Sequence, residues 1–260
     1  MVFIHGLGTI ASDYEDVRHY FLTHGYCDSE FYATSYGKGA LTLATDAVFC
    51  QYVKSQRLLI AAVAAYTNNE VDIIGFSMGS PMGRKAILGG NCVDTGEDLG
   101  DPLTNYVHTF IGVAGANFGA AYLCHVVVPA PLFHVCNSNN GISCHSDLLN
   151  ELNSQGYTYE GRLVYTLYSE DDEVVGYKVC GGTVLATAIP GETKAFGFGP
   201  VSVESGETRL VIITIEHAFF IVTPAGSLWS DAPHSGFTGQ SDHCRPGSVT
   251  FHRTLHQSSS

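Results

Sequence analysis

Apolar and polar residues follow two different periods along the first two thirds of the chain, one typical of strands and one typical of helices. Strands are predicted where short apolar or alternating runs occur, at residues 2–4, 30–36, 71–76, 106–115 and 161–169. Helices are predicted between these runs, at residues 12–26, 41–67, 82–88 and 145–154. Strands that alternate with helices in this way are typical of a mostly parallel sheet flanked by helices, so the predicted fold class is α/β.

Residues 181–260 have a less regular pattern, rich in Gly, Pro and Ser, with one strand-like stretch at residues 208–215. A chain of 260 residues, of which 45% are hydrophobic, is long enough to bury one large core. We therefore predict a single domain over residues 1–256 and a mobile tail at residues 257–260.

The charge balance excludes two classes of partner. The formal net charge is −13, and the 12 Lys and Arg residues are scattered along the chain. The sequence therefore shows no basic cluster that would bind a nucleic acid or an anionic membrane surface. The longest apolar stretch, at residues 210–223, is interrupted by Glu216 and His217 and is shorter than the roughly 18 residues that a membrane span requires. Stable membrane insertion is therefore not predicted, and the pattern is silent on oligomeric state.

Eight cysteines are many for a cytosolic enzyme, and their even number favours disulfides in an oxidising compartment. No C-x-x-C pair occurs, so a zinc site is not predicted. Cys136 and Cys144 are close enough in sequence to close a short loop. The chain begins on a predicted strand without a signal-peptide pattern, so either a leader is missing from it or the protein is intracellular.

The pentapeptide GFSMG, residues 75–79, places a serine between two glycines where a strand passes into a helix. This context is the one in which G-x-S-x-G forms a strained turn that exposes a nucleophilic serine above the sheet. The glycines are needed because strand and helix approach too closely for side chains at those positions. We therefore predict Ser77 as a nucleophile, against the alternative of an ordinary tight turn.

The dipeptide His5-Gly6 directly follows the first predicted strand, where hydrolases of this kind form one side of an oxyanion hole. The expected donors to the developing oxyanion are the backbone amides of Leu7 and Met78. His5 is interpreted as a structural residue, because the base of such a hydrolase comes last in the chain.

The acid is expected between the serine and the base, at the carboxyl end of a later strand. Residues 170–173 are four consecutive carboxylates after the strand at 161–169. Asp172 is the preferred acid and Asp171 the alternative, although a run of carboxylates is also typical of a solvated loop.

Five histidines follow the acid and are candidates for the base: His217, His234, His243, His252 and His256. His234 is preferred because its small, turn-forming neighbours suit an exposed loop. His217 and His243 remain alternatives. His217 lies within an apolar run, and the last two histidines lie close to the C-terminus, where the chain is expected to move.

Taken together, the segments VFIHGLG, FYATSYG, VDIIGFSMGSPMGRKAILGG, VAGANFG and YSEDDEVV resemble the class 2 lipases, a family of secreted α/β-hydrolases, over residues 2–180. The resemblance implies an α/β-hydrolase fold and hydrolysis of acylglycerols or other carboxylic esters, without a metal or organic cofactor. It also implies Ser77 as nucleophile and Asp172 as acid, with an oxyanion hole at Leu7 and Met78. The family's leader and the few residues before its first strand have no counterpart here, and PHSGF, around His234, fits the family pattern loosely.

The residues alone do not exclude a different class of function. The same fold can serve as a binding or interaction module without catalysis. An ester hydrolase requires an activated serine, whereas a binding module does not. A thioesterase or a peptidase would use the same three side chains, so the pattern does not separate these enzymes.

Overall fold

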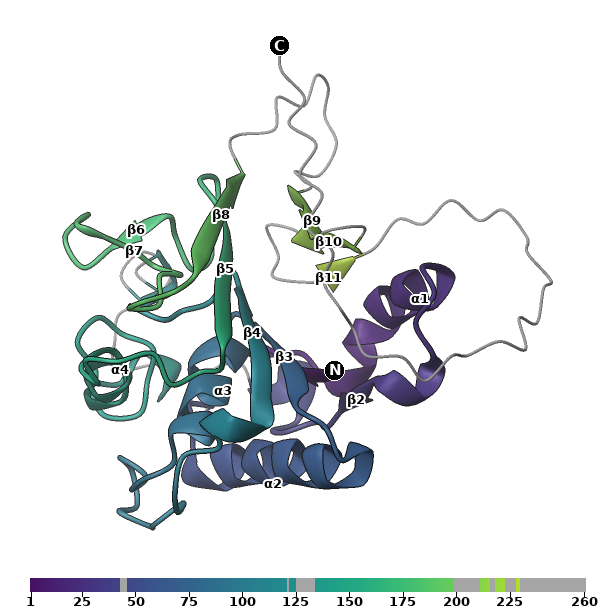
Figure 1. Cartoon of the computed structure of the whole chain (residues 1–260). Coiled ribbons are helices and arrows are strands. Elements are labelled where there is room, and N and C mark those ends of the chain that lie inside the picture. Colours follow the sequence, from purple (N-terminus) through teal and green to yellow (C-terminus); the bar gives the residue numbers. More distant parts are fainter. Residues whose placement is uncertain are drawn as a thin grey trace, which may run out of the picture.

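The computed structural model describes residues 1–42, 46–120, 122–124 and 134–198, together with the backbone of three further strands between residues 211 and 229. Its centre is a six-stranded sheet in the order β2-β1-β3-β4-β5-β8, in which every neighbouring pair is parallel (Figure 1). The strands of this sheet are β1 (Val2–Ile4), β2 (Tyr32–Ala33), β3 (Val71–Phe76), β4 (Val107–Val113), β5 (Leu163–Ser169) and β8 (Lys194–Phe198). The predicted mostly parallel sheet is thereby confirmed.

The α-helices of the described chain lie on the two faces of this sheet. They are α1 (Glu15–Thr23), α2 (Cys50–Thr67), α3 (Gly79–Leu88) and α4 (Asp147–Asn153). Short 3-10 helices lie at Ala11–Tyr14, Asp28–Glu30, Gly39–Thr42, Thr104–Tyr106 and His134–Cys136. Two smaller sheets pair β6 (Lys178–Val179) with β7 (Val184–Leu185), and β9 (Val211–Ile215) with β10 (Ala218–Val222) and β11 (Leu228–Trp229).

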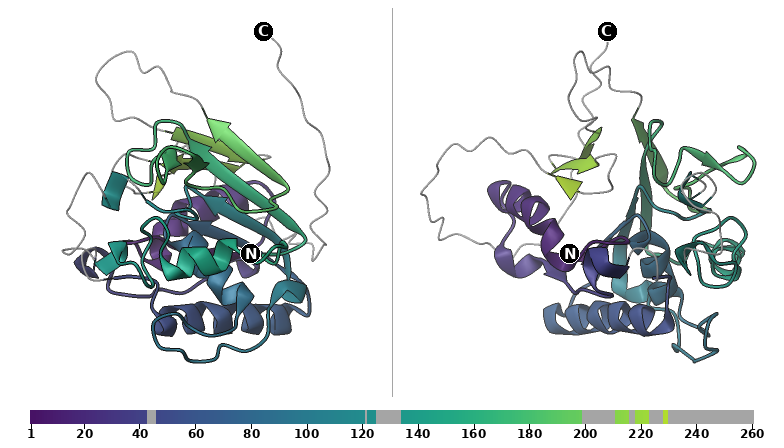
Figure 2. Two further views of the ribbon diagram at one scale, coloured as in Figure 1. Left: turned by 90° about the vertical axis from the view of Figure 1, so that its left-hand side faces the viewer. Right: turned by 180° about the vertical axis from the view of Figure 1, so that it is seen from behind.

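Alternation along the strands produces two separate cores, one on each face of the sheet. On one face, Val2, Ile4 and Ile73 pack with buried residues of α2, α3 and α4. On the other face, Phe3 and Ile74 pack with buried residues of α1. Figure 2 shows the resulting three layers, with α1 on one side of the sheet and α2 and α3 on the other. Both faces are covered, as a parallel sheet requires, and the carboxyl ends of its strands meet at one edge.

The helix predicted at residues 41–67 is shorter in the structure and begins at Cys50. Phe49 is extended at its N-cap, with φ −71° and ψ 145°. The neighbouring Val48 N–H donates to the carbonyl oxygen of Asn140 at 3.0 Å. The first helical N–H, that of Cys50, donates to Asp94 Oδ2 at 3.0 Å. The helix start is therefore set by two segments distant in sequence, which the helical spacing of apolar residues does not reveal.

The predicted strand at residues 30–36 is also shorter, because only Tyr32 and Ala33 pair with β1. Beyond them the chain leaves the sheet, and the Tyr36 N–H donates to Nε2 of His5 at 3.0 Å. The strands at 71–76, 106–115 and 161–169 are confirmed within two residues at each end.

Residues 210–223 contain β9 and β10, which pair antiparallel. Within the described part of the chain, no helix is both long enough and apolar enough to cross a bilayer. The predicted tail at residues 257–260 lies outside the described residues.

Candidate active site

Ser77 occupies a strained turn between β3 and α3. Its φ angle is +52°, in the left-handed region that residues other than glycine seldom adopt. The Ser77 N–H donates to the Val113 carbonyl at 2.9 Å, and its own carbonyl accepts from the N–H groups of Ser80 and Ala116 at 3.1 and 3.3 Å. Neighbouring main-chain groups thus hold the strained conformation, and the serine side chain remains half-exposed at the carboxyl edge of the sheet.

The flanking glycines are required by close backbone contacts. A Cβ added at Gly75 would lie 2.8 Å from the Cα of Ser80. A Cβ added at Gly79 would overlap the carbonyl oxygens of Ile4 and His5. Because these obstacles are backbone atoms, no rotamer change relieves them, and the sequence-based reason for the two glycines is confirmed.

We expect Gly79→Ala to lower the free energy of unfolding by about 3 kcal/mol or more, because α3 must separate from the end of β1 to admit a methyl group. Gly83, one turn later in the same helix, is the matched control. A Cβ there would lie 2.9 Å from Ile4 Cδ1 and 3.2 Å from Phe110 Cε2, the ends of two buried side chains, which yield more easily than backbone atoms do. Gly83→Ala is therefore expected to cost about 1 to 2 kcal/mol, less than Gly79→Ala. Urea unfolding measures both, and equal losses would contradict the backbone explanation.

The loop after β1 lies directly against the serine. A Cβ at Gly6 would lie 2.9 Å from Ser77 Cβ, so the loop reaches this position only with glycine. Met78 is fully buried and is the N-cap of α3, where the first N–H groups have no partner within the helix. Leu7 is partly exposed. The loop after β1 and the start of α3 therefore both lie beside Ser77, and the role of the Leu7 and Met78 amides remains a prediction.

His5 is 1% exposed, and both of its ring nitrogens have partners. Nε2 accepts from the Tyr36 N–H, and Nδ1 lies 2.9 Å from the Gly6 carbonyl oxygen. Burial lowers the pKa of this imidazole, so the neutral form is favoured. A histidine with both nitrogens engaged inside the protein fits the structural role expected for it.

Asp172 lies in the loop after β5, two strands from β3 at the same edge of the sheet. Its Oδ1 accepts from the N–H groups of Val174 and Val175 at 2.8 and 2.9 Å. These bonds fix the carboxylate and leave Oδ2 without a bond among the described residues. The side chain of Asp171 has no hydrogen bond within the described part of the chain. The main chain therefore holds Asp172 in one orientation, and its choice over Asp171 as the acid remains a prediction.

The position of the base is not described. His234 and its alternatives, His217 and His243, lie outside the described residues, as do His252 and His256. The described part of the sheet ends with β8, the strand next to β5, and all five histidines follow it in the chain. The base therefore remains a prediction from residue order.

Three disulfides lie within the described residues, joining Cys50 to Cys92, Cys124 to Cys136 and Cys144 to Cys180. The suggested Cys136–Cys144 loop closure is wrong. Cys144 instead pairs with a residue beyond the acid loop, 36 positions further along the chain. Spacing alone favours near neighbours, whereas the fold brings the segment around Cys144 against the segment that follows Asp172. The disulfide therefore restrains the chain directly after β6, eight residues beyond the acid candidate.

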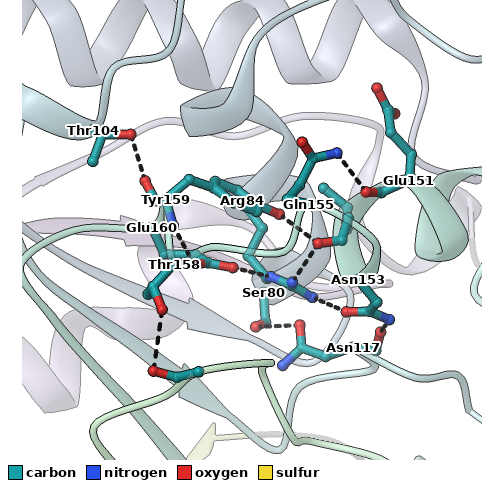
Figure 3. Close-up of polar contacts among 12 residues, drawn as sticks. Ser80, Arg84, Thr104, Asn117, Glu151, Asn153, Gln155, Thr158, Tyr159 and Glu160 are labelled. Carbon is teal, nitrogen blue, oxygen red and sulfur yellow. Dashed lines mark hydrogen bonds and ion pairs between the residues drawn. The ribbon is translucent and has the colours of Figure 1, made fainter.

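Figure 3 shows a buried polar network that joins Ser80 and Arg84 of α3 to later segments of the chain. The sequence did not predict this network. Ser80 Oγ, one turn after Ser77, donates to Asn117 Oδ1 at 2.9 Å. Asn117 Nδ2 donates to the Thr187 carbonyl at 2.8 Å, and its own carbonyl accepts from Asn153 at 2.8 Å. The network therefore fixes the first turn of α3 to the loop after β4, to α4 and to the segment before β8. Its one sequence signal is VAGANFG, which contains Asn117.

The same network continues to a buried ion pair between α3 and the segment before β5. Arg84 Nε lies 2.8 Å from Glu160 Oε1, and neither side chain is more than 1% exposed. The other two Arg84 nitrogens donate to Asn153 Oδ1 and the Leu152 carbonyl, each at 3.0 Å. All three guanidinium nitrogens therefore have an acceptor, which is the condition under which a buried charge is tolerated.

The chain was compared with known proteins. Residues 1–196 match the family model for Lipase (class 2). No curated protein sequence matches the chain significantly. Among solved structures, Aspergillus fumigatus lipase B has a TM-score of 0.53 at 14% identity, over 76% of this chain and 44% of that one. Phospholipase PlaB from Legionella pneumophila, in complex with thio-NAD, has a TM-score of 0.50 at 16% identity, over 72% and 43%.

At such low identity, the solved structures establish the fold alone, which is that of the α/β-hydrolases. This chain spans less than half the length of either protein. The family match, in contrast, covers most of the chain and includes the serine turn, the loop after β1 and the acid loop. The chain belongs to the class 2 lipase family.

Proposed function

We propose that this protein is a serine carboxylic ester hydrolase that acts on acylglycerols or related lipid esters through a Ser77-His234-Asp172 triad. Leu7 and Met78 supply the oxyanion hole, and no metal or organic cofactor takes part. Membership of a lipase family supports ester hydrolysis as the reaction class. The lipase and phospholipase neighbours share the fold and extend the proposal no further.

The observation that carries the proposal is the backbone of Ser77. A non-glycine residue at φ +52° costs free energy, and such strained residues cluster at functional sites. Here it holds a hydroxyl at the carboxyl edge of the sheet, beside the Gly6 loop and at the N-terminus of α3.

In the proposed reaction His234 removes the proton from Ser77 Oγ, and the oxygen bonds to the ester carbonyl carbon. The former carbonyl oxygen becomes an oxyanion, which accepts hydrogen bonds from the amides of Leu7 and Met78. The alcohol leaves with the proton from His234, while Asp172 holds the imidazole in the tautomer that accepts the serine proton. Water, deprotonated by His234, then cleaves the acyl-enzyme, which releases the carboxylic acid and restores Ser77.

We further propose that the protein works outside the cell, since three disulfides lie in the described part of the chain. The net charge of −13 supports a small ester or lipid as partner rather than a nucleic acid.

Labelling with a fluorophosphonate probe tests the activated serine without any assumption about the substrate. We expect one label per chain, on the peptide that contains Ser77, because only a deprotonated hydroxyl attacks the probe rapidly. Urea-unfolded protein is the control and should remain unlabelled, since unfolding separates the serine from its base. Folded protein that stays unlabelled would instead favour a non-catalytic binding module. Turnover of p-nitrophenyl butyrate, a thioester and a peptide anilide then separates the hydrolase classes.

A further inference from the structure

The carbonyl oxygen of Gly6 is held by two side chains. His5 Nδ1 lies 2.9 Å from it, and the Thr9 hydroxyl donates to it at 3.0 Å. Thr9 Oγ1 and His5 Nδ1 are themselves 3.5 Å apart, so the three groups form a closed triangle. One peptide carbonyl with two side-chain donors is strongly restrained in orientation.

The tautomer of His5 follows from its second partner. The Tyr36 N–H donates to Nε2 at 3.0 Å, so Nε2 carries no proton and Nδ1 must carry one. The Nδ1–H is then the donor to the Gly6 carbonyl. The Tyr36 ring stacks on the imidazole with centroids 3.8 Å apart, and its hydroxyl donates to the His5 carbonyl at 2.6 Å. Tyr36 therefore fixes both the ring and the tautomer of His5.

Restraint of the Gly6 carbonyl also determines the direction of the next amide. A peptide unit is planar and trans, so its C=O and the following N–H point in opposite directions. No cis peptide bond is present in the described residues. The Leu7 N–H therefore points away from His5 and Thr9. Gly6 itself packs against Ser77, as shown by the 2.9 Å from an added Cβ to Ser77 Cβ.

We propose that Thr9 and His5 are positioning residues that clamp the Gly6–Leu7 peptide so that the Leu7 N–H is aimed at the oxyanion formed at Ser77. This inference rests on the proposed ester hydrolysis and adds to it how one oxyanion donor is held in place. Neither side chain needs to touch the substrate. Their effect is greatest when charge develops on the ester oxygen, because an aligned donor stabilises an oxyanion more than a neutral carbonyl.

Thr9→Val tests the clamp, because valine keeps the shape of threonine and removes the hydroxyl. We expect kcat for p-nitrophenyl butyrate to fall about fivefold, as for the loss of roughly one hydrogen bond, with KM changed less than about twofold. Binding of phenylboronic acid, whose serine adduct resembles the tetrahedral intermediate, should weaken by a similar factor. Thr9→Ser keeps the hydroxyl and should restore kcat.

Thr23→Val is the matched control. Its hydroxyl donates to the carbonyl oxygen of Tyr20, three residues earlier, at 2.7 Å. This bond has the same spacing as the bond from Thr9 to Gly6, but it lies at the end of α1. Thr23→Val should leave kcat unchanged. Thr9 is partly exposed, so Thr9→Val is expected to fold, and the melting temperature verifies this.

The results separate the clamp from the proposed function. A Thr9→Val variant with the full wild-type kcat would overturn the clamp. Equal changes in kcat and KM that the Thr9→Ser variant does not reverse would also overturn it. Ester hydrolysis would stand in either case. Wild-type protein with neither turnover nor labelling at Ser77 would overturn both.

Discussion

Replacement of Ser77 by alanine is expected to abolish ester turnover, with kcat for p-nitrophenyl butyrate lowered about 10⁶-fold, as for other serine hydrolases that lose the nucleophile. The proposed reaction passes through an acyl group bonded to Ser77 Oγ, and the neighbouring Ser80 hydroxyl is buried and donates to Asn117 Oδ1. Alanine removes that oxygen only. The strained backbone, with its bonds to Val113, Ser80 and Ala116, should persist, and folding should be unaffected.

The measurement needs to separate lost chemistry from lost structure. Urea unfolding of Ser77→Ala should match wild type or show slightly higher stability, since strained sites at active centres are often costly to the fold. Ser154→Ala is the control, because Ser154 is exposed at the end of α4 and has no part in the site. Turnover above about 1% of wild type in pure Ser77→Ala protein would refute the acyl-enzyme at this position.

Asp172→Asn is expected to produce the second largest effect, a fall in kcat of about 10⁴-fold with little change in KM. The amide has the same shape as the carboxylate, but it favours the wrong tautomer of the base and does not stabilise the imidazolium. The bonds from Val174 and Val175 to Oδ1 remain available to the amide oxygen. The loop should therefore keep its conformation, and the loss is one of chemistry.

Asp171→Asn is the matched comparison one residue earlier. It removes the same charge from the same loop, where the side chain is partly exposed and solvent screens it. We expect its kcat to stay within about threefold of wild type. The opposite result, with Asp171→Asn inactive and Asp172→Asn active, would show that Asp171 is the acid, which is the alternative that the sequence left open.

The serine turn was predictable because its physical causes are local. GFSMG lies between a segment with strand periodicity and a segment with helix periodicity. Any chain that turns so sharply brings backbone atoms too close to Gly75 and Gly79 for a side chain to fit there. The order of strands and helices also predicted the parallel sheet, since each face of a covered sheet requires apolar residues. These features depend on spacing and composition, which a sequence displays directly.

Contacts between distant segments were not predictable in the same way. Tyr36 fixes His5 across 31 residues, and Asn117 reaches Ser80 across 37. Nothing in the neighbourhood of either residue indicates its partner, because each bond exists only after parallel strands have aligned their carboxyl ends. The pairing of Cys144 with Cys180 and the start of α2 at Cys50 have the same origin.

The sequence by itself determined the fold class, the family likeness and the serine turn, because these follow from short-range periodicity and steric need. It also predicted the acid and the oxyanion loop. The choice of base also rests on the sequence, through the order of residues along the chain. Only the tertiary structure decided how the site is supported: the clamp on Gly6, the network under α3, the disulfide partners and the bonds that distinguish Asp172 from Asp171. The physical reason is that a hydrogen bond or disulfide depends on the positions of both partners, which only the folded chain establishes.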